Sequence, residues 1–558
     1  MSRAYLSYLA NLFDSNEHSD CTIAFCVEVE GPPAAKRPRT RKSTAQCQAD
    51  AGRKGVEDLP AHLMVVCGGS DHLAELVQEW RDEHPSYPAA GPAAAAVAPR
   101  PELPVSLDSA ADLPHARAAI RFIYTGKLPR AAAAADLLQI RRQAARLAIK
   151  GCVERCDDAV ASRAITAAGV MELHACRHLL PPRDEPSTAA LLAACRRQLV
   201  RNAGAYLANL AHPAPALGEL LAWLFPDAPS VLSDPDTRRQ MCALPAAALE
   251  ALLRCDVFAT DDEASVLLLL GHWLQANGSA TTPETRARLC RLVRLSHLNT
   301  AYLHGLLPKI AWFPLCREEH QFVCQYVAES GARRRKSLAA AAAGKHDCSG
   351  AWYAAPRRPA ARADAGVPYE WSIKLEDLAA DLDLATHKIP NGLNGAFANG
   401  ATRLVAHGFE WYPSAIWFNN DGKPEPVLSC AVPAPFAAFT SAKDVVGVAA
   451  ATAQLSVFRW RESASGNGDG SVDGGADGGG GSGGGCVPRR EAANVKVYGG
   501  DEVVSVTSGL AAGAGWRMTV FGKGVEKAPG ASSRLLPELL APYLHSGRLS
   551  GSLTFLEA

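Results

Sequence analysis

The sequence has no long hydrophobic run, few aromatic residues and no net charge. Its longest run of Leu, Ile and Val covers Val266 to Leu270, whereas a helix that crosses a bilayer needs roughly 20 apolar residues. Lys and Arg together number 57, as do Asp and Glu, so overall charge indicates neither nucleic-acid nor membrane binding. The N-terminus also lacks a signal-peptide pattern. We therefore expect a soluble intracellular protein with no nucleic-acid or membrane partner.

The motifs of the common enzyme classes are missing as well. There is no Gly-x-Ser-x-Gly between a strand and a helix, no Gly-rich loop ending in Lys-Ser/Thr, no His-Glu-x-x-His and no cysteine-protease motif. The 16 cysteines repeat no spacing, which argues against a RING, and the close pair Cys152 and Cys156 has no second pair to complete a zinc site. We predict a non-catalytic protein with no metal and no cofactor.

A strand followed by an insertion is expected near the N-terminus of this chain, whose 558 residues suit roughly three to four domains. Residues 20–27 alternate as a strand does. Residues 31–56 contain paired prolines and polar filler, which predicts a disordered insertion. Its centre holds five positive charges in seven residues: Lys36, Arg37, Arg39, Arg41 and Lys42. This basic run is either a nuclear import signal or a solvated loop. We predict a nuclear protein and leave an additional cytoplasmic pool open.

Residues 59–127 carry the most informative pattern. An apolar run at 63–67 predicts a helix or buried segment, and Ser70 is placed to cap the helix that follows it. That helix has apolar residues at the three-four spacing of an amphipathic helix: Leu73, Leu76, Val77 and Trp80. Residues 116–124 are helical again, and Gly126 ends them.

A further helix is expected from Asp136. Its apolar residues share one face, and Arg141, Arg142 and Arg146 share the other. A basic face could contact nucleic acid, but we favour a solvated surface.

In this order, these segments resemble a BTB (POZ) domain, an α/β protein-docking domain. The resemblance rests on Leu-Pro-Ala-His at 59–62, Phe-x-Tyr-Thr-Gly at 122–126 and the last Leu-rich helix with its Cys. The positions that carry it are Asp20, Ala61, His62, Phe122, Tyr124 and Gly126. Leu63 stands where BTB domains usually have Lys. The resemblance implies a BTB domain over residues 1–160 that forms a homodimer.

Residues 241–331 resemble the BACK domain that follows BTB in many adaptors, after a helical connector at 161–240. Thr260-x-x-Glu263 has the form of a capping box, and the next helix is expected to bury one face that includes Val266 and Trp273. Thr282-Pro283 begins another helix. His297 and His304 are more typical of packed or solvated residues than of metal ligands. The order is especially similar to the plant light-response BTB (POZ/BACK) group.

The C-terminal third changes from helix to strand patterns. Residues 332–365 read as a linker, because they combine a basic run, an alanine tract and Pro-Arg-Arg-Pro. Alternating segments over 366–558 predict an all-β sandwich, which is similar to the TRAF/MATH type. The Gly-rich tract within 463–490 is expected to be a disordered loop, because no strand or helix organises its glycines.

The resemblance implies a substrate-recruiting adaptor of a cullin-3–RING E3 ubiquitin ligase. The BTB and BACK domains would hold the cullin-3 N-terminal domain, and the C-terminal region would hold a substrate protein of unknown identity. The cullin-binding motif of BTB adaptors falls here on Trp80, Arg81, Asp82 and Glu83; alternatively, Trp80 only closes its helix face. A second hypothesis is a BTB scaffold that dimerises and recruits transcriptional or signalling partners without a cullin.

Overall fold

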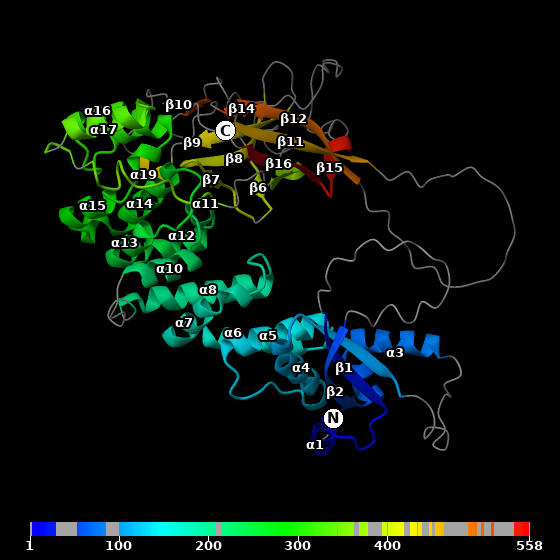
Figure 1. Ribbon diagram of the computed structural model, residues 1–558. Coiled ribbons are helices and arrows are strands. Elements are labelled where there is room, and N and C mark those ends of the chain that lie inside the picture. The colour runs from blue at the N-terminus through cyan, green and yellow to red at the C-terminus, as the bar shows by residue number, and fades with distance from the viewer. Residues whose placement is uncertain are drawn as a thin grey trace, which may run out of the picture. The chain divides into compact units, whose positions relative to one another are not determined.

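The computed structural model divides the chain into two compact units, Met1–Asn202 (unit 1) and Ala203–Ala558 (unit 2), drawn in Figure 1. Each unit is described by itself. The residues that the structure describes are 3–28, 53–84, 100–204, 206, 214–342, 344–346, 348–361, 368–377, 393–398, 400–417, 424–431, 433–437, 446–448, 452–461, 489–498, 504–506, 515–517 and 541–556.

Unit 1 begins with a small sheet packed against helices. Its strand order is β2-β1-β3, with β1 (Cys21–Glu28) antiparallel to β2 (Arg53–Ala61) and parallel to β3 (Glu102–Leu107). One apolar core joins the strands to α2 (Leu63–Gly69), α3 (Asp71–Glu83) and α4 (Leu113–Thr125). Near the chain start, α1 (Arg3–Leu12) lies against α4. The alternation of apolar residues in β1 and β3 places Ile23, Phe25 and Val105 in this core.

The expected helix signals in unit 1 are confirmed. The Ser70 hydroxyl accepts a hydrogen bond from the Leu73 N–H at 3.0 Å and so caps α3. Gly126 ends α4 with a φ of 62°, a left-handed conformation that glycine adopts without steric cost. One boundary is wrong: the insertion predicted over 31–56 ends earlier, because β2 begins at Arg53 and pairs with Glu28 of β1.

Four helices complete unit 1. They are α5 (Ala134–Arg146), α6 (Cys152–Arg163), α7 (Ala167–Ala175) and α8 (Pro186–Arg201). Helix α6 packs against α5, α7 and α8, and its buried face carries Cys152, Cys156 and Val160. The two cysteines, four residues apart, therefore act as small apolar core residues.

The helices of unit 2 include one, α14 (Glu263–Asn277), that is buried along most of its length. They are α10 (Ala214–Leu224), α11 (Ala228–Ser233), α12 (Pro235–Cys242), α13 (Ala246–Arg254), α14 (Glu263–Asn277), α15 (Pro283–Cys290), α16 (Arg317–Ala328), α17 (Ala332–Ala341) and α19 (Ala434–Ala437), with a π-helical turn, η5 (Ala301–Leu306). Val266 to Leu270 of α14 are all completely buried. The expectation of a single buried face on α14 is therefore wrong for this stretch, because five consecutive residues are buried where α11, α12, α15 and α19 pack against the helix.

The helix start before α14 also differs from the prediction. The capping residue is Asp262, which accepts from the Ala264 N–H at 2.8 Å, and not Thr260. The Thr260 hydroxyl instead donates to the Asp262 carbonyl at 2.7 Å. The predicted start at Thr282 and Pro283 is confirmed, because Thr282 caps α15 and proline occupies its first turn.

Unit 2 also contains three sheets. The six-stranded sheet has the order β12-β11-β16-β4-β6, with β15 paired to β16. The five-stranded sheet has the order β14-β9-β8-β5, with β7 paired to β8. The third sheet is the pair of β10 and β13. The strands are β4 (Tyr369–Lys374), β5 (Leu393–Asn394), β6 (Ala396–Phe397), β7 (Leu404–Ala406), β8 (Phe409–Trp417), β9 (Pro424–Ala431), β10 (Val446–Val448), β11 (Thr452–Arg461), β12 (Arg489–Tyr498), β13 (Val504–Val506), β14 (Gly515–Arg517), β15 (Leu544–His545) and β16 (Arg548–Leu556).

The strands that alternation predicts near 371–375, 455–460 and 549–555 are present as β4, β11 and β16. The loop predicted over 463–490 lies outside the described residues, except that β12 already begins at Arg489. As a whole, the chain is a multidomain protein with many helices and small sheets, of mixed α and β type.

Candidate functional site

Two of the positions on which the BTB resemblance rests, His62 and Tyr124, are hydrogen-bonded to each other in unit 1. The backbone N–H of His62 donates to the hydroxyl of Tyr124 at 3.1 Å, and the His62 ring lies 3.3 Å from the same oxygen through Nδ1. On its other side, Nε2 of His62 lies 2.9 Å from the Glu17 carbonyl. These bonds join the turn after α1, the junction between β2 and α2, and α4, and they leave the His62 ring occupied at both nitrogens.

Two further positions that carry the resemblance, Asp20 and Ala61, form hydrogen bonds close to His62 in the chain. Oδ1 of Asp20 accepts from the Leu63 N–H at 2.7 Å, so Asp20 satisfies the first donor of α2. The Asp20 N–H in turn donates to the Ala61 carbonyl at 3.2 Å. At the far end of α4, the Gly126 N–H donates to the Phe122 carbonyl at 2.7 Å. All six positions thus have structural roles, and burial raises the pKa of Tyr124 so that its hydroxyl keeps its proton.

The predicted cullin-contact residues lie at the C-terminal end of α3. Trp80 is half-buried and stacks on His84, with ring centroids 4.5 Å apart. Arg81, Asp82 and Glu83 are exposed, and Asp82 accepts a hydrogen bond from Gln78 at 2.8 Å. The helix end therefore presents one aromatic ring beside two carboxylates and a guanidinium.

The three arginines of α5 do not form a free basic face. Arg141 is buried and ion-paired with Asp157 at 2.6 Å and with Glu185. Arg142 pairs with Asp112 at 2.6 Å, and Arg146 pairs with Asp108. The expectation of a solvated arginine face is therefore wrong for Arg141, whose charge joins α5 to α6 and to the start of α8.

The two histidines considered as metal ligands contact different neighbours. Nε2 of His297 lies 2.9 Å from the Ala355 carbonyl, and Nδ1 of His304 lies 3.5 Å from Sγ of Cys324. Within the part of the chain that the structure describes, no three His, Cys, Asp or Glu side chains form a group that could hold a metal ion. The basic run at 36–42 lies outside the described residues.

A feature that sequence reasoning missed is the turn between β7 and β8, which is buried against α14. The His407 N–H donates to the Asp261 carboxylate, and the Gly408 N–H donates to the Ser265 hydroxyl at 2.9 Å. The His407 carbonyl accepts from the Asn299 side chain at 3.1 Å, and the Gly408 carbonyl accepts from the Tyr302 hydroxyl. The N–H and the carbonyl of both turn residues therefore each have a hydrogen-bond partner on or next to the helices.

Part of the segment expected to be a linker, residues 352–361, is also packed into unit 2. Arg358, in its Pro-Arg-Arg-Pro motif, is completely buried and lies 3.1 Å from the Glu263 carboxylate. The same guanidinium donates to the Leu253 carbonyl at 2.8 Å. Trp352 is buried as well, and its indole N–H donates to the Cys290 carbonyl at 2.8 Å. These residues are part of the helical core, and the linker interpretation is wrong for them.

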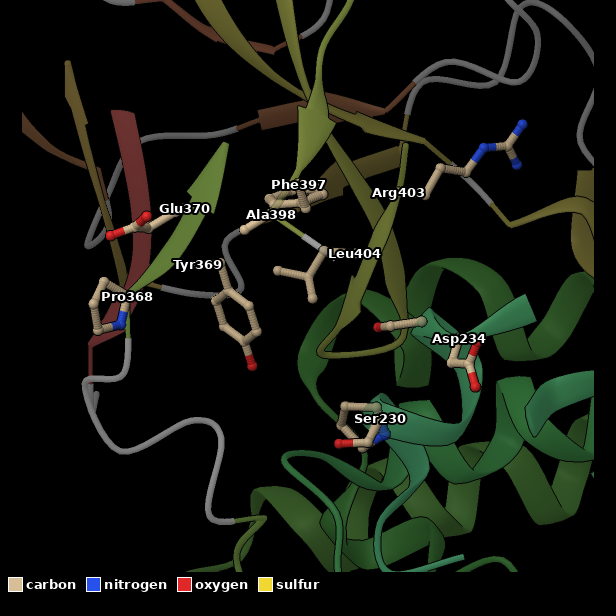
Figure 2. Close-up of a pocket in the computed structure, with 11 residues that line it drawn as sticks. Ser230, Asp234, Pro368, Tyr369, Glu370, Phe397, Ala398, Arg403 and Leu404 are labelled. Carbon is tan, nitrogen blue, oxygen red and sulfur yellow. The ribbon is translucent and has the colours of Figure 1, made fainter. Parts of the chain in front are cut away.

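A pocket of about 370 Å³ lies in unit 2 between the helices and the strands (Figure 2). Residues of α11 and the start of α12 form one wall, and residues of β4, β6 and β7 form the other. The lining residues are Pro229, Ser230, Ser233, Asp234, Pro368, Tyr369, Glu370, Phe397, Ala398, Arg403 and Leu404. None of them was a predicted site residue. The lining residues come from four separate stretches of the chain, and no local sequence pattern predicts that these stretches lie together.

No protein-family model matches this chain, and no curated protein matches it. No helix among the described residues combines the length and the apolar character needed to cross a membrane.

Proposed function

We propose that the protein is a substrate-recruiting adaptor of a cullin-3–RING E3 ubiquitin ligase. In this proposal unit 1 is a BTB domain that dimerises and holds the cullin N-terminal domain. The helices of unit 2 act as a BACK domain, and its sheets, of TRAF/MATH-like type, hold the substrate. The protein itself makes and breaks no bonds, since it only brings substrate lysines close to the charged enzyme. We also propose that it works in the nucleus, on the basis of the basic run at 36–42.

The architecture of unit 1 supports the docking role. A BTB domain has a small strand layer wrapped in helices, and the β2-β1-β3 sheet with α1 to α4 is compatible with that description. The network of Asp20, His62 and Tyr124 gives a structural reason for the positions on which the resemblance rests.

The observation that carries the proposal is the exposed end of α3. An aromatic residue followed by acids at a helix end offers a partner both apolar area and charge, the combination found at the centres of protein interfaces. Arg81, Asp82 and Glu83 are exposed, and Trp80 is partly exposed beside them.

A pull-down of the purified full-length chain with the cullin-3 N-terminal domain tests the proposal. We expect wild-type protein to bind, and Trp80→Ala or Glu83→Arg to weaken binding by about tenfold or more, as for a central interface residue. Glu154→Arg on α6 is the matched control, because Glu154 is equally exposed and lies on another helix.

Two outcomes would contradict the adaptor. If wild-type protein binds no cullin, the alternative of a BTB scaffold without a cullin stands instead. If both α3 variants bind as well as wild type, the contact is not at this helix end. Light scattering on the same samples measures whether the chain forms the dimer that both hypotheses require.

A further inference from the structure

A cysteine and two histidines lie together at the surface of unit 2. Sγ of Cys324 lies 3.5 Å from Nδ1 of His304 and 3.5 Å from Nε2 of His320. His320 and Cys324 are four residues apart on α16, a spacing that places both on one face of the helix, and His304 belongs to η5. His304 is exposed, and the other two residues are partly exposed. A small reactant in the solvent can therefore approach the sulfur.

The two imidazoles have different hydrogen-bond roles. Nε2 of His320 lies 2.8 Å from the Leu303 carbonyl. Because a carbonyl oxygen only accepts, Nε2 of His320 carries a proton and cannot take another from the thiol. Nδ1 of His304 is therefore the nitrogen placed to accept the S–H proton of Cys324. The His320 N–H, in turn, is placed to donate to the sulfur when the sulfur becomes negative.

The Cys324 thiol needs such a base in order to react. Burial raises the pKa of this thiol, so the sulfur keeps its proton at neutral pH, whereas the thiolate is the nucleophilic form. Imidazole is the side-chain base whose ordinary pKa lies closest to neutral pH, and its neutral form accepts a proton. A thiol within hydrogen-bond distance of a base is the arrangement of an activated nucleophile.

From these relationships we propose that Cys324 is a modification site, which hydrogen peroxide oxidises to a sulfenic acid with His304 as the base and His320 as the donor to the sulfur. The sulfur attacks one peroxide oxygen, so that an S–O bond forms and the O–O bond breaks. The S–H proton passes to Nδ1 of His304 and then to the leaving hydroxide, which becomes water. The sulfur loses two electrons, and the peroxide gains them. Because this step involves neither α3 nor a cullin, the inference is independent of the proposed function.

Trapping of the sulfenic acid in the reduced full-length chain tests the proposal. The chain is treated at neutral pH with hydrogen peroxide and dimedone, which forms a stable adduct with sulfenic acids, and mass spectrometry quantifies the adduct at each cysteine. Cys255 is the internal reference, because it is also partly exposed and no described histidine lies within hydrogen-bond distance of its sulfur. Since an ordinary thiol is only a few per cent ionised at neutral pH, we expect about tenfold or more adduct at Cys324 than at Cys255.

Two histidine variants make the test specific. His304→Gln removes the base, and we expect the adduct at Cys324 to fall about fivefold or more with no change at Cys255. His297→Gln is the matched control, because Nε2 of His297 contacts the Ala355 carbonyl, and it should leave the adduct at Cys324 unchanged.

Three results would overturn the proposal. The first is that Cys324 of the wild-type chain forms no more adduct than Cys255, a comparison that needs no variant. The second is that His304→Gln leaves the adduct at Cys324 unchanged. The third is that His297→Gln lowers this adduct as much as His304→Gln does.

Discussion

The guanidinium of Arg358 lies 3.1 Å from the carboxylate of Glu263, and both side chains are almost fully excluded from solvent. The two residues are far apart in the chain. Arg358 follows α17, and Glu263 is the first residue of α14. Glu263 also accepts from the Arg294 N–H at 2.9 Å, so one buried carboxylate anchors both the segment after α17 and the segment after α15.

Removal of one partner of this pair should be strongly destabilising. Arg358→Met leaves Glu263 buried without its countercharge, and we expect the free energy of unfolding to fall by about 3–5 kcal/mol. The double variant Arg358→Met/Glu263→Gln should recover much of this loss, because no buried charge remains. Urea denaturation of the full-length chain measures both changes. Arg254→Ala is the control, with an expected loss below about 1 kcal/mol, because the Arg254 side chain is 52% exposed and its partner Glu250 keeps Arg288 as a second partner. Equal losses for Arg254→Ala and Arg358→Met would contradict the argument.

Because the turn between β7 and β8 packs against α14, alanine substitutions at two glycines should destabilise the protein by unequal amounts. Gly408 and Gly400 both have a left-handed backbone, with φ of 81° and 78°, so alanine costs about 1–2 kcal/mol of backbone strain at either. A Cβ at Gly408 would lie 2.6 Å from Cβ of Ala264 and 2.8 Å from the Tyr302 ring, whereas one at Gly400 would meet nothing within 4 Å. We expect Gly408→Ala to cost about 1–3 kcal/mol more than Gly400→Ala. Thermal unfolding of the two variants side by side measures this difference, and a difference of zero would show that the turn is not packed on α14.

The stability of unit 2 should depend on pH through Asp262. Burial raises the pKa of Asp262 from 3.8 to about 7. The folded state therefore binds a proton that the unfolded state has released, so the stability contribution is complete below about pH 4 and is lost as pH rises to about 7. Over that interval the free energy of unfolding falls by about 1.4 kcal/mol per pH unit for this one proton.

Asp262→Asn isolates this effect, since its amide oxygen can still accept from the Ala264 N–H and the Asn299 side chain. We expect the variant to gain stability relative to wild type as pH rises from 4 to 7. Denaturant unfolding at several pH values measures the difference, and curves that stay parallel would rule out the titration of Asp262.

Tyr124 offers a test in unit 1. Tyr124→Phe leaves the buried N–H of His62 without the acceptor that it has at 3.1 Å, and we expect a loss of about 1–3 kcal/mol. Tyr8→Phe is the matched control, because Tyr8 is 52% exposed and should change little. If the two variants unfold at the same denaturant concentration, the network around His62 contributes nothing.

Much of unit 1 could be predicted from the sequence because its signals are local. Periodicity and backbone preference decide secondary structure within a few residues. Such signals are the alternation at 20–27, the helix cap at Ser70 and the helix end at Gly126. The sequence singled out Asp20, His62 and Tyr124 only by resemblance, and the structure supplies their hydrogen bonds, from the His62 N–H to Tyr124 and from the Leu63 N–H to Asp20.

In unit 2 the sequence by itself determined the start of α15 and the strands β4, β11 and β16, but not α17, which lies in the stretch predicted to be a linker. Only the tertiary structure decided what covers them. Arg358 lies in a stretch with linker composition, and Gly408 lies in an ordinary turn, yet both are buried against α14 by residues more than 90 positions away. The pocket arises in the same manner, because α11 and β4 approach through long-range packing. Such contacts depend on the fit of distant surfaces, which is a property of the folded chain and not of any short segment.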